Sequence, residues 1–268
     1  NDTNLDPPIF GYSHLMELPK LDWKGIFEYN IIGITEMVTC FVNTNFQKQL
    51  IIEEARKIFS SSICGVLKDR LEVLPKLVVP SDIRPSKTGN YKKIIYWGDI
   101  AGRTKSFIEF RSCIEQLRKK RTDFTVWIPL LKSSHQFLKH NWVINDNSNN
   151  KRTFFKYLRS CCVGVSPKNQ FYDWDKTIIE GIKSGIPFII YDSVPSKNLY
   201  GESTFYKSNK DLIALLNKYL DDIQFRNLIV EKSIGELINK HNFLKKVKVI
   251  NRLIIKAING VKSVHNAK

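Results

Sequence analysis

From residue 93 onward, short apolar runs alternate with stretches of helical spacing, and this alternation constrains the fold more than any other feature. The runs are rich in β-branched and aromatic residues: "KIIYWG" (93–98), "FTVWIPLL" (124–131), "CVGVSP" (162–167) and "IPFIIYD" (186–192). The helical stretches are "SFIEFRSCIEQLRKK" (106–120), "KRTFFKYLRSC" (151–161, capped from Asn149 or Asn150), "KTIIEGIKSG" (176–185) and "KDLIALLNKYLDD" (210–222). Apolar strands that alternate with helices are typical of a parallel sheet covered on both faces. We therefore predict a doubly wound α/β domain over residues 91–225.

Residues 1–85 form a different block. "IFGYSHL" (9–15) and "VTCFVNT" (38–44) predict two strands, 45–59 predicts a helix, and a further strand leads to a Pro/Ser/Gly linker near 80–90. Two strands are too few for an independent Rossmann-like half, so we predict part of a second Rossmann-like domain. We expect the chain to be a fragment, or to complete this sheet with a missing N-terminal segment or a second chain. Helices over 226–268 are expected to close the chain.

The charge balance is strongly basic, with 42 Lys and Arg against 26 Asp and Glu and a net charge of +16. No acidic residue follows Glu236, whereas eight Lys or Arg do. An excess of this size indicates a polyanionic partner, either nucleic acid or an anionic membrane surface. The alternative is a lysine-rich proteome, which would account for part of the excess.

The five cysteines are odd in number, lack metal-ligand spacing and lie in or beside apolar segments. This pattern indicates reduced, buried thiols, a cytoplasmic location and no metal site. No apolar run approaches the roughly 18 residues of a membrane span, and the first residues show no signal-peptide pattern.

Polar residues gather at the start of the helix predicted at 176. Asp175, Lys176 and Thr177 open this helix, and Glu180 lies one turn further on the same face. A helix N-terminus attracts phosphate, and a carboxylate one turn away accepts hydrogen bonds from a ribose. In open α/β sheets, ligands bind at the carboxyl ends of strands, and "CVGVSP" ends just before this turn. The alternative is that these residues only cap and solubilise a surface helix.

A second strand-to-helix turn, "YWGDIAGRTKSF" (96–107), has the composition of a phosphate site. Gly98 and Gly102 let the backbone approach a ligand closely, and Arg103 and Lys105 can neutralise a diphosphate. The turn matches neither GxxxxGK[ST] nor GxGxxG, so the sequence supports neither a P-loop ATPase nor a nicotinamide enzyme. The alternative is an ordinary glycine turn with solvated cations.

Taken together, these two turns and the run "KTIIEGIKSGIPFIIYD" resemble the nucleotide-sugar domain of GT-B glycosyltransferases over residues 93–225. The resemblance extends more weakly to 9–85 and to the helices after 222. It implies that Glu180 binds the donor ribose, that the residues just before it hold the diphosphate, and that Arg103 and Lys105 stabilise the leaving phosphate. The implied donor is a UDP- or GDP-linked sugar, and no cofactor is implied.

The resemblance also bears on stereochemistry and on the sugar. Many retaining members carry two glutamates with seven residues between them, and Tyr172 stands at the partner position of Glu180. The expected outcome is retention, with the partner position changed. His14 ends a candidate strand where this family often places a histidine facing the donor sugar; the alternative is a packed or solvated histidine. Trp174 is the tryptophan expected to touch base or sugar.

Three hypotheses for the acceptor follow. The donor-domain motifs loosely resemble those of phage DNA glucosyltransferases, which implies a modified base in DNA as acceptor, with Lys245, Lys246 and Lys248 as nucleic-acid contacts. Alternatively, the basic and apolar faces of 242–264 suit a membrane-associated enzyme of envelope or lipid-linked glycans. The third hypothesis is a non-catalytic nucleic-acid-binding relic of the fold. We favour DNA.

Overall fold

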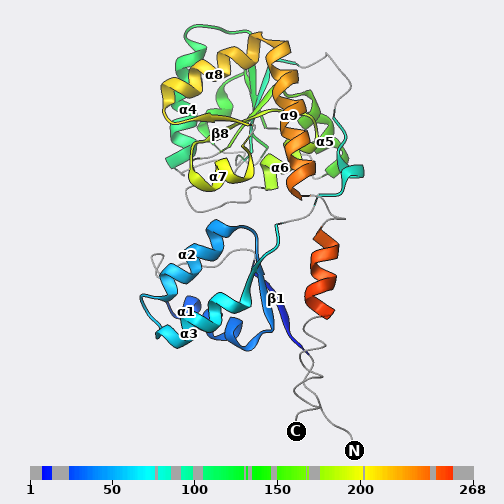
Figure 1. The fold of residues 1–268 in the computed structure, drawn as a ribbon. Helices are drawn as coiled ribbons and strands as arrows, with labels where there is room; N and C mark the ends of the chain where they lie inside the picture. Colours follow the sequence, from blue (N-terminus) through cyan, green and yellow to red (C-terminus); the bar gives the residue numbers. More distant parts are fainter. Residues whose placement is uncertain are drawn as a thin grey trace, which may run out of the picture. The chain divides into compact units, whose positions relative to one another are not determined.

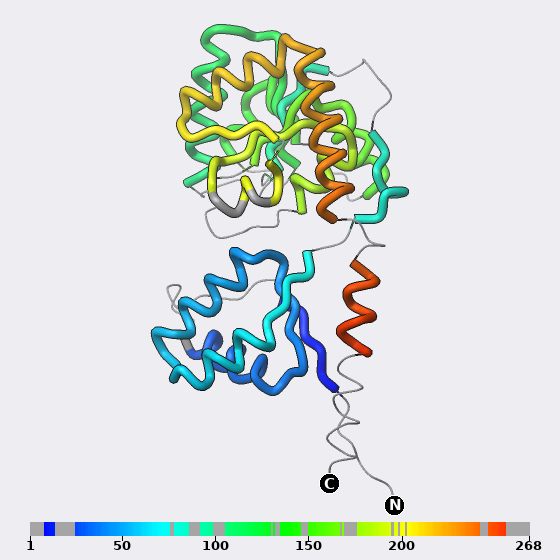
Figure 2. The backbone as a smooth tube through the Cα atoms, in the orientation of Figure 1, coloured from blue at the N-terminus to red at the C-terminus, as the bar shows by residue number. Residues whose placement is uncertain are grey.

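The computed structural model describes residues 8–13, 24–75, 78–85, 92–98, 105–129, 131, 135–145, 150–166, 168, 176–201, 203–241 and 246–255. The chain divides into two compact units (Figures 1 and 2): unit 1 comprises Asn1–Val78 with His241–Lys268, and unit 2 comprises Val79–Lys240. The functional division predicted from the sequence, into an acceptor-side part (1–85), a donor-binding part (91–225) and closing helices (226–268), stays a prediction.

Unit 2 is built on a six-stranded parallel sheet of order β6-β5-β4-β7-β8-β9. Its strands are β4 (Ile94–Trp97), β5 (Thr125–Trp127), β6 (Val143–Ile144), β7 (Val163–Val165), β8 (Phe188–Tyr191) and β9 (Thr204–Tyr206). From β4 the chain adds strands toward one edge, and from β7 it adds strands toward the other. The predicted doubly wound α/β fold is confirmed, and its order reverses between β4 and β7.

Helices cover this sheet on both faces (Figure 1). They are α4 (Lys105–Arg118), α5 (Lys151–Ser160), α6 (Lys176–Lys183), α7 (Val194–Leu199), α8 (Asn209–Asp221) and α9 (Ile223–His241), with 3₁₀ turns η2 (Pro80–Asp82) and η3 (Gln136–Lys139). Local sequence fixes several starts. Asn150 caps α5 by accepting from the Arg152 N–H, as predicted, and Ser208 with Asp211 forms a capping box on α8.

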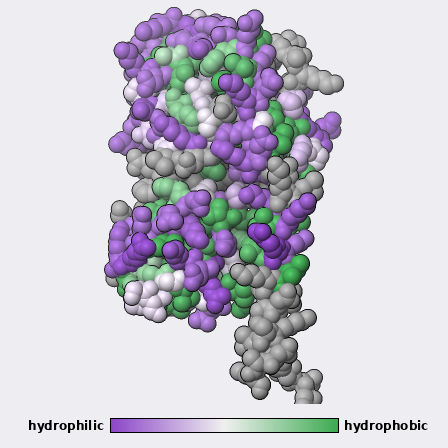
Figure 3. Space-filling model, in the orientation of Figure 1, coloured by the Kyte–Doolittle hydropathy of each residue, from purple (hydrophilic) through white to green (hydrophobic). Residues whose placement is uncertain are grey.

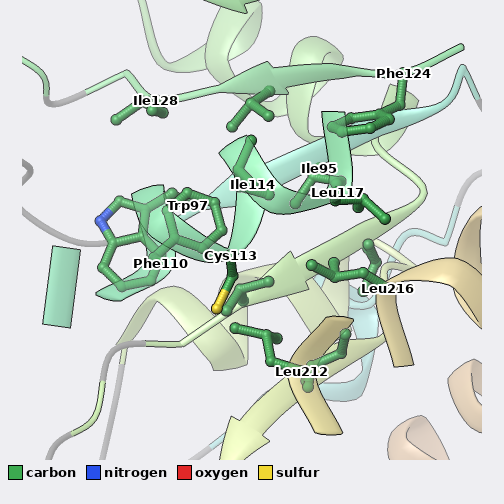
Figure 4. Packing of buried hydrophobic residues seen from close by; sticks show 14 of the residues in the cluster. Ile95, Trp97, Phe110, Cys113, Ile114, Leu117, Phe124, Ile128, Leu212 and Leu216 are labelled. Atoms are coloured by element: carbon green, nitrogen blue, oxygen red, sulfur yellow. The ribbon is translucent and has the colours of Figure 1, made fainter. Parts of the chain in front are cut away.

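The two faces of the sheet bury different side chains. On the α4 and α8 face, Trp97 stacks on Phe110 with ring centroids 4.4 Å apart, and Leu212 and Leu216 complete the cluster drawn in Figure 4. On the opposite face, Trp127 lies 5.0 Å from the Tyr96 ring and contacts Phe154 and Tyr157 of α5. Aromatic side chains of this size dominate core burial, so both faces are well covered.

Unit 1 holds a smaller parallel sheet of order β1-β2-β3. The elements are β1 (Phe10–Ser13), α1 (Lys24–Glu36), β2 (Thr39–Val42), α2 (Asn45–Ala55), α3 (Ser61–Arg70), β3 (Leu71–Val73) and a helix over 246–255. Phe27 and Ile31 of α1 pack with Leu67 of α3 in one buried cluster. The sequence did not predict α1, because its β-branched residues and two glycines obscure the helical period.

The cysteines agree with the prediction of buried thiols. All five cysteines are buried and unpaired, and burial raises the pKa of Cys162 to about 11 and that of Cys161 well above its usual value. Hydrophilic side chains cover much of the face drawn in Figure 3, interrupted by apolar patches. Among the described residues, no helix has the length and apolar character needed to cross a membrane.

Candidate functional site

The carboxyl ends of β4 and β7 meet where the strand order of unit 2 reverses. The two strands pair directly, with Trp97 opposite Val165. Gly98 follows β4 and leads toward α4, whereas Ser166 follows β7 and leads toward α6. In open α/β sheets, the connections diverge at such a point and leave a crevice in which ligands bind. Both turns singled out in the sequence therefore start from this one place.

Thr177 joins the two turns through a short contact. Its hydroxyl donates a hydrogen bond to the Gly98 carbonyl at 2.7 Å. Its methyl group lies so close to Gly98 that a Cβ added there would overlap it. Glycine is thus required by close approach at this position. The structure gives Thr177 a role in holding the first turn of α6 against the end of β4.

Further glycines let α6 lie close to the sheet. A Cβ on Gly181 of α6 or on Gly164 of β7 would overlap the Phe188 ring, so this ring fills the space between helix and strand. Gly185 ends the helix with φ of 82°, and Pro187 precedes β8. The sequence "EGIKSGIP" therefore fixes how the helix carrying Glu180 is seated.

Glu180 is the fifth of the eight residues of α6, and its side chain is 27% exposed. Its Oε1 lies 3.4 Å from the Nζ of Lys183, one turn further along. Lys183 is only 15% exposed and its Nζ also lies 3.6 Å from Asp82. A partly buried carboxylate with a fixed cation on one oxygen is well suited to accept hydrogen bonds from ligand hydroxyls on the other.

Cationic side chains stand at the starts of both helices. Lys105 opens α4 and Lys176 opens α6, and both are exposed. Neither forms an ion pair with a described carboxylate. Nearby, the Ser106 hydroxyl donates to the Lys168 carbonyl at 3.2 Å, and Lys168 forms an ion pair with Glu109. The start of α4 is thereby tied to the segment that follows β7.

Sequence analysis did not identify Ser166 and Asp192, two polar residues that lie directly after β7 and β8. Ser166 is buried, its hydroxyl accepts from the Tyr191 N–H at 3.4 Å, and its carbonyl accepts from the Tyr206 hydroxyl at 3.3 Å. Asp192 follows β8, and its hydrogen bond to Lys197, with the charge of Lys207, lowers its pKa. Their position directly after apolar strands was the available signal.

The structure describes only part of the predicted site. Gly98, Lys105, Lys176, Thr177 and Glu180 belong to unit 2, and the Thr177 hydrogen bond brings Gly98 together with the start of α6. Lys246 and Lys248 lie in the 246–255 helix of unit 1, where Lys248 is exposed. The remaining predicted residues lie outside the described residues: His14, Gly102, Arg103, Tyr172, Trp174, Asp175 and Lys245. Within the described part, no cluster of His, Cys, Asp or Glu is suited to a metal ion.

Comparison with known proteins places the fold. No protein-family model and no curated protein sequence matches the chain. Its structure is similar to that of TarM, with a TM-score of 0.72 at 14% identity over 92% of this chain and 50% of that chain. It is also similar to Anabaena Alr3699/HepE in complex with UDP and glucose, with a TM-score of 0.69 at 10% identity over 91% and 70% of the two chains.

A third similar structure is an α,α-trehalose-phosphate synthase (UDP-forming) from Burkholderia vietnamiensis, with a TM-score of 0.65 at 11% identity over 97% and 70% of the chains. S. aureus TarM has also been solved as a mutant with fondaparinux, α-GlcNAc-glycerol and UDP. The fold is thus α/β and GT-B-like, and the chain spans about half the length of the TarM chains. At these identities the likeness shows the fold alone.

Proposed function

We propose that the chain belongs to a glycosyltransferase that uses a nucleotide diphosphate-sugar, UDP-linked rather than GDP-linked, and that unit 2 binds this donor. The observation that carries this proposal is the Thr177–Gly98 contact, which joins the two phosphate-suited turns at the β4/β7 switch point. The similar HepE structures hold UDP, UDP-glucose, or UDP with glucose, and TarM holds UDP. These proteins support the choice of UDP.

In this proposal residues of unit 2 bind and stabilise the donor. Glu180 accepts hydrogen bonds from the ribose hydroxyls, and Lys105 and Lys176, with Arg103 and Asp175–Thr177, surround the diphosphate. The bond between the sugar C1 and the diphosphate oxygen breaks, C1 bonds to an acceptor oxygen on the face that the diphosphate leaves, and the acceptor's proton passes to the departing UDP. Negative charge grows on the departing UDP, so nearby cations act mainly in the transition state.

Other site residues complete the proposal from the sequence. His14 would face the donor sugar, Gly102 would let the backbone approach the diphosphate, and Trp174 would touch the base or sugar. No metal or cofactor is part of the proposal. The proposed stereochemical outcome is retention, which anomeric analysis of the product by NMR tests directly.

For the acceptor, we propose a hydroxyl on a modified DNA base. The net charge of +16 supports a polyanionic acceptor. Lys246 and Lys248, with Lys245, are the proposed DNA contacts. Replacing all three by Gln should flatten the salt dependence of duplex binding by roughly one unit for each phosphate that no longer pairs with a lysine. The competing acceptor is a lipid-linked or envelope glycan at an anionic membrane surface.

A nucleotide-sugar panel tests the function. UDP, GDP and their glucose and N-acetylglucosamine conjugates would be screened by thermal shift, and then for transfer or hydrolysis. The reactions would be run alone, with duplex DNA containing hydroxymethylated bases, and with anionic liposomes carrying a glycan acceptor. UDP-sugar binding with transfer to DNA supports the full proposal. Transfer in the liposome reaction instead would show that the acceptor is the glycan and not the DNA base. Nucleotide-independent DNA binding without turnover would favour the non-catalytic relic.

A further inference from the structure

Lys183 stands between Glu180 and the segment by which the chain enters unit 2. Its Nζ lies 3.4 Å from Glu180 Oε1 and 3.6 Å from Asp82 Oδ2. Asp82 belongs to η2, a few residues after unit 2 begins at Val79. One partly buried ammonium group therefore bridges the candidate ribose-binding carboxylate and this entry segment, residues 79–85.

The backbone makes the same connection independently. The Arg84 N–H donates a hydrogen bond to the Lys183 carbonyl at 2.9 Å. Lys183 is the last residue of α6, so its carbonyl is one that the helix itself leaves without an N–H partner. The entry segment thus satisfies the end of α6 through its backbone and reaches the Lys183 side chain through Asp82.

The two carboxylate oxygens of Glu180 have different surroundings. Lys183 donates a hydrogen bond to Oε1 at 3.4 Å, and Oε2 receives no hydrogen bond from the described residues. A carboxylate with one oxygen fixed by a cation loses rotational freedom before a ligand arrives. Prior ordering of this kind strengthens binding because less entropy is lost in the complex.

We infer that Lys183 is a positioning residue: it fixes Glu180 through Oε1 so that Oε2 binds the donor ribose, and through Asp82 it links this orientation to the entry segment. The inference rests on the proposed function, since it needs a nucleotide at Glu180. Lys183 itself need not touch the nucleotide. Its side chain acts on Glu180, so removing Glu180 should make Lys183 irrelevant to affinity.

A double-mutant cycle with UDP tests this dependence by calorimetric titration of the full chain. Lys183→Met should raise the Kd for UDP roughly tenfold, a coupling typical of residues in contact. In a Glu180→Gln background, the same change should leave the Kd unaltered, and Lys183→Arg should restore most of the wild-type affinity. Asp82→Asn should raise the Kd less, because Asp82 is 56% exposed and more distant.

Lys57→Met provides the matched control, because Lys57 forms an i,i+3 pair with Glu54 at 2.6 Å in unit 1. It should leave the Kd unchanged. Wild-type protein that binds UDP, with Lys183→Met binding equally well, overturns this inference alone. So does a Lys183→Met effect that persists in the Glu180→Gln background, since that would show direct ligand contact or general disruption. Wild-type protein that binds no nucleotide overturns the proposed function and this inference with it.

Discussion

The glycines beside the ends of β4 and α6 in unit 2 have surroundings opposite to those of the glycines in helices α1 and α3 of unit 1. In unit 2, a Cβ at Gly98 would overlap Thr177, and a Cβ at Gly181 would overlap Phe188. In unit 1, a Cβ at Gly25 or Gly33 of α1, or at Gly65 of α3, would have no atom within 4 Å. Gly98 and Gly181 thus permit close helix–sheet contacts, whereas the three helix glycines of unit 1 lie at exposed positions and only weaken their helices.

The same contrast appears in side-chain burial. Unit 2 buries aromatic side chains on both faces of its sheet, including Trp97 and Trp127. In unit 1, α1 leaves Ile26, Tyr29 and Ile32 exposed, with Tyr29 at 78%. Dense packing of this kind supports the strands and helices that carry the described part of the candidate site, and preorganised binding requires such support. The difference therefore favours unit 2 as the place of the ligand chemistry.

The largest effect is expected from Trp97→Ala in unit 2. Removing this side chain leaves a cavity beside Phe110 and should cost about 3–5 kcal/mol of unfolding free energy. Urea unfolding followed by hydrogen exchange would assign the loss to unit 2. Trp97→Phe should cost much less, because the Trp97 Nε1 has no hydrogen-bond partner among the described residues. A loss below about 1 kcal/mol for Trp97→Ala, far under the usual cost of such a cavity, would contradict the contrast in packing.

A smaller loss is expected from Gly98→Ala. The new Cβ would overlap the Thr177 methyl and should cost about 1–3 kcal/mol, the usual range for overpacking. Thr177→Ser removes the methyl but keeps the hydroxyl that bonds the Gly98 carbonyl. The double variant should therefore recover much of the lost stability in urea unfolding. Equal stability of Gly98→Ala and wild type would show that the β4–α6 contact is looser than described.

The opposite sign is expected for Gly33→Ala in unit 1. Gly33 lies within α1 with open space at its Cβ, so alanine should stabilise the helix by about 0.5–1 kcal/mol. Gly65→Ala in α3 offers a parallel case. Thermal unfolding of both variants would measure the gain. Destabilisation by either substitution would show that these exposed helix faces pack against something in solution.

The smallest effect concerns the acid stability of unit 2, through the ion pairs that Arg121 forms with Asp123 and Asp221. Arg121 bonds both Asp123 and Asp221, which lowers the pKa of Asp221 to about 2 and that of Asp123 further. A carboxyl group with a lowered pKa stabilises the fold above its unfolded pKa near 4, and this contribution is lost as pH falls from about 4 to 2.

Both carboxylates are about half exposed, so each pair should contribute only about 0.2–1 kcal/mol. Asp221→Asn should lower the unfolding free energy at pH 7 by the contribution of its pair. It should also reduce the loss of unfolding free energy between pH 4 and 2. Chemical unfolding at pH 7, 4 and 2 would measure both effects. An Asp221→Asn protein with the wild-type pH profile would show that solvent already screens the pair fully.

The strand–helix alternation predicted the fold of unit 2 well, because its strands are apolar throughout and its helices begin at clear caps such as Asn150. Prediction failed for α1, because exposed apolar residues lie between its buried Phe27, Ile31 and Ile34 and obscure their helical spacing. The very short β6 and the β9 strand also escaped notice. Neither carries a run long enough to separate strand from loop.

For the candidate site, sequence indicated which turns matter but not how they meet. The pairing of Thr177 with Gly98 spans 79 positions and depends on the strand order, which residue patterns do not encode. The roles of Ser166 and Asp192 depend on neighbours from other strands for the same reason. Lys183 resembles an ordinary helix-end cation in the sequence, and only the fold shows that two carboxylates lie beside it.

The most direct measurement of the central claim is calorimetric titration of UDP into wild-type protein, Glu180→Gln and the control Glu115→Gln. Glu115 also pairs with a cation on its own helix, Arg111 at 2.7 Å, but away from the switch point. We predict that the wild type and Glu115→Gln bind UDP equally, and that Glu180→Gln binds it more weakly by about 1–3 kcal/mol, the loss of a charge-assisted hydrogen bond. Equal UDP affinity in all three proteins would contradict the assignment of Glu180 to the ribose.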